Sequence, residues 1–214
     1  MRTDELIRML ATGAEPVTFR PPGRRLASGL VPAAIASTVL MAVALGVNPA
    51  LGATATDPMF WVKLGLGGAL LRAGWLACVR LSQPGARLGR GPAAVALAAV
   101  LAIWALAALA TAAAGPEQRA GLWWGQTWSG CPWNIAALSA PALTATLWAM
   151  RGLGPTRLRR AGAAAGLLSG ALGAMVYTLH CPELDAPFIA VWYLVGISIP
   201  TVAGAALGPR MLRW

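Results

Sequence analysis

Long apolar runs alternate with short polar junctions along most of this chain. Six runs cover residues 26–47, 59–81, 92–114, 129–150, 161–179 and 187–207. Each is close to the roughly 20 residues that a helix needs to cross a hydrocarbon core of about 30 Å. Alanine and leucine dominate and no alternation of period two appears, which favours helices over strands. The pattern predicts an all-α, polytopic membrane protein, a bundle of six transmembrane helices.

Arginines are concentrated in alternate junctions. They are Arg2, Arg8, Arg20, Arg24, Arg25, Arg80, Arg87, Arg90, Arg151, Arg157, Arg159, Arg160, Arg210 and Arg213. The other junctions hold only Arg119 and, just inside a helix end, Lys63. Because cytoplasmic loops carry an excess of Lys and Arg, both termini are predicted to be cytoplasmic and Cys131 and Cys181 to face outside.

The composition supports the membrane assignment. The 214 residues are 57% hydrophobic and 11% charged, with a mean hydropathy of +0.64, which is too apolar for a soluble domain of this size. The net charge of +10 does not indicate a nucleic-acid partner, since no basic stretch is interleaved with aromatic residues. We therefore expect membrane lipid around the chain and no direct contact with nucleic acid.

Three segments are expected: a cytoplasmic N-terminal tail (1–25), a transmembrane domain (26–208) and a cytoplasmic C-terminal tail (209–214). Thr3 can cap a short amphipathic helix whose first turn contains Asp4, and Pro16 limits its length. Its apolar face carries Leu6, Ile7 and Leu10. A helix this short has only marginal stability by itself in water. Its apolar face is therefore expected to dock on a partner or on the protein itself. A solvated or membrane-lying leader is the alternative.

Two polar junctions, residues 130–134 and 179–185, carry the candidate chemistry. Two membrane helices of about 20 residues each and a turn fit between Cys131 and Cys181, which places both junctions at one membrane surface. The second junction adds His180, Glu183 and Asp185. This donor set suits either a soft or borderline metal ion or a reversible disulfide. A permanent structural disulfide and inert thiols remain as alternatives, because no CxxC pair is present.

Two cations lie in the second run. Arg72 is far from either end, where a charge is costly and is by default a functional candidate; the alternative is that it snorkels or bonds to helix carbonyls. Lys63 is near the outer end and is interpreted as reaching the headgroups. In the fifth run, Gly162, Gly166 and Gly170 are spaced by four, which favours a central helix or a homodimer contact.

No enzyme constellation is present: the chain has no HExxH, no GxSxG and no Walker loop. We therefore expect a protein that is not an enzyme and has no permanent cofactor, only a transient heavy-metal ion at the cysteines. A small-solute transporter and a membrane thiol oxidoreductase are the competing function classes.

Short stretches spread along the whole chain form a distinctive set. They are residues 2–7 (RTDELI), 16–17 (PV), 57–63 (DPMFWVK), 83–85 (QPG), 180–183 (HCPE), 186–188 (APF), 192–193 (WY) and 208–210 (GPR). Together they resemble the NrsF family, negative regulators of sigma F. The HCPE stretch, with the APF and WY that follow it, is the most specific part.

The resemblance implies a six-helix anti-sigma factor of the bacterial inner membrane. Members of the family are similar in holding an extracytoplasmic-function sigma factor of the sigma F type and in releasing it when paired outer cysteines sense heavy metal or oxidant. Carried onto this chain, those cysteines are Cys131 and Cys181, with His180 and Glu183 as further candidates beside them. The resemblance also favours the tail as the sigma-binding segment, with candidates Asp4, Leu6, Ile7 and Leu10.

Overall fold

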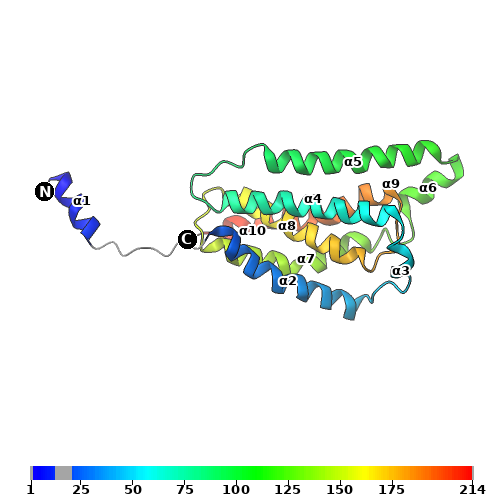
Figure 1. The fold of residues 1–214 in the computed structure, drawn as a ribbon, viewed down its shortest axis with the longest axis horizontal. Helices are drawn as coiled ribbons and strands as arrows, with labels where there is room; N and C mark the ends of the chain where they lie inside the picture. Colours follow the sequence, from blue (N-terminus) through cyan, green and yellow to red (C-terminus); the bar gives the residue numbers. More distant parts are fainter. Residues whose placement is uncertain (1, 13–20, 214) are drawn as a thin grey trace.

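The computed structural model describes residues 2–12 and 21–213, and every regular element within these residues is helical (Figure 1). The long helices are α2 (Pro22–Ala44), α4 (Pro58–Leu81), α5 (Gly91–Ala113), α7 (Cys131–Arg151), α8 (Leu158–Thr178) and α10 (Leu194–Met211). The short elements are α1 (Thr3–Thr12), α3 (Leu51–Thr54), α6 (Pro116–Trp124), α9 (Ala186–Phe188) and the π-helical turn η1 (Ile189–Tyr193). Elements α9, η1 and α10 follow one another directly, so all six predicted runs are helical.

Helix starts follow local sequence signals. Proline occupies the first turn of α2, α4, α5 and α7, where its missing N–H is not needed. At α4, Asp57 adds a cap, because its carboxylate accepts a hydrogen bond from the Met59 N–H at 2.7 Å. These starts are therefore determined by residues within one turn of the helix.

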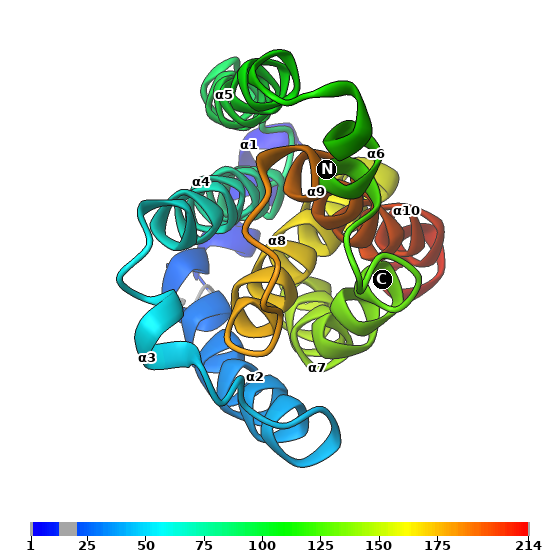
Figure 2. The same cartoon turned by 90° about the vertical axis from the view of Figure 1, so that its right-hand side faces the viewer.

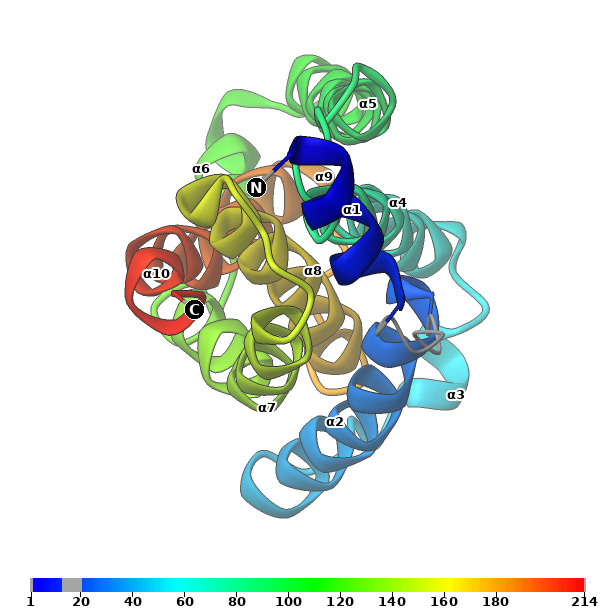
Figure 3. The same cartoon turned by 90° about the vertical axis from the view of Figure 1, so that its left-hand side faces the viewer.

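Helix α8 forms the centre of the bundle (Figures 2 and 3). It packs against α10, α4 and α7, whereas α5 lies at the edge against α4 and α9. In α8, 83% of the most apolar stretch is buried, compared with 11% in α5. The central position that the glycine spacing predicted for the fifth run is confirmed.

Glycines allow α8 and α10 to approach closely. A Cβ at Gly162 would meet the backbone of Gly204 and Gly208, and one at Gly166 would meet the Pro200 carbonyl. Small residues at intervals of four keep one helix face clear for its neighbour. The glycine stripe of α8, formed by Gly162, Gly166 and Gly170, is thus covered by α10. It needs no second copy of the chain to cover it.

Five segments are long and apolar enough to cross a membrane: α2, α4, α5, α8 and the continuous run Ala186–Met211. Helix α7 is as long as α8, at 21 residues, but it is not among these five. It is bound into the bundle by its packing on α2 and α8. Five candidate spans are therefore seen among the described residues, and six crossings stay a prediction.

The two ends of the bundle differ in charge. We call the end with loops 82–90 and 152–157 the basic end, and the opposite end the cysteine end. Within residues 21–213 the acidic residues all belong to the cysteine end: Asp57, Glu117, Glu183 and Asp185. The basic end carries most of the arginines and, within the same residues, no acidic side chain.

Helix α1 confirms the predicted short helix in the tail, and none of its residues is buried. Leu6, Ile7 and Leu10 are all exposed. Pro16, which was expected to limit this helix, lies outside the described residues. The apolar face of α1 is therefore uncovered in the part of the chain that the structure describes.

Candidate functional site

Cys131 and Cys181 lie at the cysteine end, where α7 begins and just after α8 ends. Their side chains are 0% and 1% exposed and belong to one hydrophobic cluster. Thr127 contacts both residues: its carbonyl accepts a hydrogen bond from the Cys131 N–H at 3.0 Å, and its hydroxyl lies 3.9 Å from the Cys181 Sγ. Both thiols are unbonded and enclosed.

Lys63 reaches into this site from α4. Its side chain is 1% exposed, and its Nζ donates hydrogen bonds to the carbonyl oxygens of Cys181 (3.1 Å) and Glu183 (2.8 Å). The same Nζ lies 4.7 Å from the centre of the Tyr193 ring, a cation–π arrangement.

The interpretation of Lys63 as a headgroup contact is therefore wrong. Residues 179–185 are irregular, so the carbonyls of Cys181 and Glu183 have no helical donors, and buried carbonyls without partners are costly. The ammonium of Lys63 supplies two of the missing donors. The only sequence signal for this role is that Lys63 is the chain's single lysine and lies in an apolar run.

Glu183 joins the two polar junctions through its carboxylate. That carboxylate accepts a hydrogen bond from the Gln126 N–H at 2.7 Å. Gly125 comes directly before Gln126 and has a φ of 56°. A Cβ at Gly125 would meet the side chains of Phe188 and Glu183. Only glycine suits both the backbone angle and the space. Glu183 thus holds the turn before α7 against the segment after α8.

His180 points toward a different neighbour. Its Nδ1 is 2.9 Å from the Gly46 carbonyl oxygen, in the loop after α2, and the Asn48 N–H donates to the Leu179 carbonyl at 3.1 Å. Within residues 2–12 and 21–213, no three His, Cys, Asp or Glu side chains lie close enough together to hold a metal ion. The structure therefore places Cys131 and Cys181 on either side of Thr127, gives the Glu183 carboxylate the Gln126 N–H as its partner, and turns His180 toward Gly46.

A buried tyrosine completes the wall of the site. Tyr193, in the π-helical turn η1, is 1% exposed, and its hydroxyl has no hydrogen-bond partner among the described residues. π-Helical turns are frequent at functional sites, and an unpaired buried hydroxyl calls for an explanation. Tyr193 is a site residue that the sequence did not reveal.

A cluster of tryptophan side chains packs the turn before α7 against η1. The rings of Trp124, Trp128 and Trp192 contact one another, with centroids 4.9 to 5.5 Å apart. Trp192 also donates from Nε1 to the Trp123 carbonyl at 2.8 Å. This cluster fixes the loop that carries Thr127 beside Cys181.

Asp185 is the other acidic group of the second junction. Partial burial, together with the nearby charge of Glu183, raises the pKa of the Asp185 carboxyl. Asp185 stands immediately before α9 without making a side-chain cap. It therefore resists ionisation in the folded chain.

The remaining predicted site residues lie away from the cysteines. Arg72 is exposed on α4, and Asp4, Leu6, Ile7 and Leu10 are exposed on α1. The site proper is thus built from Lys63, Cys131, Cys181, Glu183 and Tyr193.

Comparison with known proteins gives one family and two relatives that match over nearly all of the chain or all of it. The model of the family NrsF, "Negative regulator of sigma F", matches residues 10–214. A probable anti-sigma-F factor NrsF from Azospira oryzae is 48% identical and the anti-sigma-F factor NrsF of Caulobacter vibrioides is 40% identical, each over the full length of both chains. No solved structure matches. The chain belongs to the NrsF family of negative regulators of sigma F.

Proposed function

We propose that this protein is an anti-sigma factor of the bacterial inner membrane. It binds an extracytoplasmic-function sigma factor of the sigma F type and releases it when Cys131 and Cys181 bind a heavy-metal ion or are oxidised. The observation that carries the proposal is the full-length similarity to two proteins named as anti-sigma-F factors. Placing both thiols in one buried cluster supports the sensing part.

The two thiols suit reversible binding of a signal, a metal ion or an oxidant, rather than a permanent cofactor. Two thiols suit a soft metal ion, which would bind as thiolates and release two protons. Alternatively, an oxidant takes two electrons and two protons from the pair, and one S–S bond forms. For His180 or Glu183 to become further ligands, each would have to give up its present partner, the Gly46 carbonyl or the Gln126 N–H.

A change at the cysteines would reach the basic end through the helices that meet at the cysteines. Cys131 begins α7 and Cys181 follows α8, so drawing the sulfurs together shifts the ends of both helices. Lys63 adds α4, because it holds the Cys181 and Glu183 carbonyls. At the basic end these three helices lead into loops 82–90 and 152–157. Their rearrangement would bias two packing states that differ in affinity for the sigma factor.

The sigma factor would dock on α1 and the basic loops. Leu6, Ile7 and Leu10 form an uncovered apolar face, of the kind that lies in a groove of a partner. Asp4 in the first turn favours the helix. Arginines of the basic end complement acidic patches on a sigma factor.

The test is recovery of the partner. The tagged full-length protein would be solubilised gently from its native membranes, and the cytosolic proteins that accompany it identified by mass spectrometry. Recovery of a sigma factor, lost when residues 1–16 are deleted, is the expected result. Recovery of no cytosolic partner by a stable, monodisperse protein would contradict the proposal and favour a transporter or a membrane thiol oxidoreductase.

A further inference from the structure

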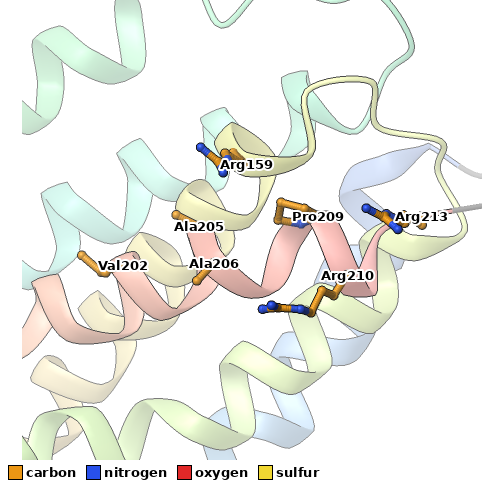
Figure 4. A pocket seen from close by; sticks show the side chains of 7 residues that line it. All are labelled: Arg159, Val202, Ala205, Ala206, Pro209, Arg210 and Arg213. Carbon is orange, nitrogen blue, oxygen red and sulfur yellow. The ribbon is translucent and has the colours of Figure 1, made fainter.

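A groove at the basic end combines arginines with an apolar wall, and the proposed contact with a sigma factor does not use that wall. It lies between the start of α8 and the end of α10 and has a volume of about 500 Å³ (Figure 4). Three of its lining residues are arginines: Arg159, Arg210 and Arg213. The others form its apolar part and lie along α10: Val202, Ala205, Ala206 and Pro209.

The three guanidinium groups face no carboxylate of the bundle. All three arginines are exposed, and the acidic residues within 21–213 belong to the opposite end. A guanidinium offers several N–H donors in a planar fork that matches phosphate oxygens. Within residues 21–213 these guanidinium groups have no acidic partner, so the groove presents unneutralised donors.

The apolar part of the groove lies within a candidate membrane span, Ala186–Met211. Val202 is 67% exposed there, and the small side chains of Ala205 and Ala206 leave the hollow beside it. A hydrocarbon chain would fit this part, whereas a small soluble anion would use only the arginines. The combination points to a ligand with a phosphate head and an apolar tail.

We propose that this α8–α10 groove binds one anionic phospholipid, with its phosphate on Arg159, Arg210 and Arg213 and an acyl chain along Val202 and Ala206. The proposal rests on the proposed topology, since anionic lipids are concentrated in the cytoplasmic leaflet, where the basic end would lie. It does not require a sigma factor, so its failure is distinguishable from failure of the anti-sigma role.

The site would act on the helix pair that the glycine stripe holds together. Arg159 is in the first turn of α8 and Arg210 is in the last turn of α10, and between these ends Gly162 contacts Gly204 and Gly208. A lipid bound to both arginines would tie the two helices together at the basic end. Retention of that lipid would therefore stabilise the full chain.

The experiment compares lipid retention by the full-length protein in detergent, using native mass spectrometry with added phosphatidylglycerol or phosphatidylcholine. We expect retention of phosphatidylglycerol alone, reduced by at least about tenfold in the triple variant R159Q/R210Q/R213Q. The matched control R24Q/R87Q/R90Q removes the same charge from the basic end outside the groove and should retain the lipid.

A second variant distinguishes the effect of the apolar part of the groove from the effect of charge. Ala206→Phe keeps every arginine and fills the apolar part, so it should also lose the lipid while remaining monodisperse. Equal losses in the two triple variants would mean general attraction to a basic surface and would overturn the proposal. Full retention by Ala206→Phe, or displacement of the lipid by inorganic phosphate alone, would overturn it as well, since the tail would then contribute nothing.

Discussion

Lys63 donates a hydrogen bond from its Nζ to the carbonyl oxygen of Cys181 at 3.1 Å, across 118 positions of sequence. The lysine thereby holds one sensor candidate through its backbone carbonyl. It also connects α4 to a site otherwise formed by α7 and α8. This contact makes Lys63 the first residue to test.

Replacing Lys63 with Met should loosen the segment after α8. The carbonyls of Cys181 and Glu183 would lose their donor, and an unpaired buried polar group costs about 1–3 kcal/mol. We expect a lower melting temperature and faster labelling of Cys181 by a maleimide. Arg72→Gln, which changes an exposed cation on the same helix, is the control. An unchanged labelling rate in Lys63→Met would show that Lys63 does not hold this segment.

Replacing Cys131 and Cys181 together with serine should abolish induction while sigma binding persists, because serine neither binds soft metals as thiolate nor forms a disulfide. The measurement is a sigma-dependent reporter with and without metal or oxidant. Cys78→Ser is the matched control, since Cys78 is equally buried but belongs to a separate core cluster. Normal induction in the double variant would refute cysteine sensing and leave the anti-sigma role untouched.

Gly166→Ala should destabilise the bundle by about 1–3 kcal/mol, because the added Cβ would meet the Pro200 carbonyl of α10. Gly65→Ala in α4 provides the comparison. A Cβ at Gly65 has nothing within 4 Å, and the change should be neutral or stabilise the helix by about 0.5–1 kcal/mol. Thermal unfolding in detergent measures both, and equal effects would contradict the close α8–α10 packing.

Leu6→Ala combined with Leu10→Ala should weaken recovery of the sigma factor by at least about 100-fold, since each buried leucine contributes roughly 1.5–3 kcal/mol at an apolar contact and the two together contribute about 3 kcal/mol or more. Arg8→Ala on the same helix changes charge outside this apolar set and should keep most of the binding. The readout is the sigma factor recovered at several salt concentrations. Greater loss with Arg8→Ala would indicate an electrostatic contact in place of the apolar one.

Asp185 should make stability depend on pH. Its folded-state pKa is raised above the ordinary value of 3.8 by burial and by Glu183. The folded chain therefore prefers the protonated form, and stability should fall as pH rises from that value through the raised pKa. Asp185→Asn should flatten this part of the melting-temperature profile. A variant profile parallel to that of the unchanged chain would assign the dependence to another group.

Local pattern determined much of this protein. Hydrophobic runs, prolines in first turns and the Asp57 cap act within a few residues, so all six helical runs and the helix of the tail could be predicted. The spacing of Gly162, Gly166 and Gly170 also indicated a close helix contact, because identical spacing on one face is a property of the helix itself.

Only the tertiary structure decided how the polar junctions are connected. Lys63 contacts Cys181, Glu183 contacts Gln126 and His180 faces Gly46, each across 57 or more positions. These pairs depend on how α4, the turn before α7 and the loop after α2 meet the segment after α8, and on which irregular carbonyls and N–H groups that meeting leaves unpaired. Side-chain types alone grouped His180 and Glu183 with the cysteines, whereas the need to satisfy buried backbone groups gave His180 the Gly46 carbonyl and Glu183 the Gln126 N–H as partners.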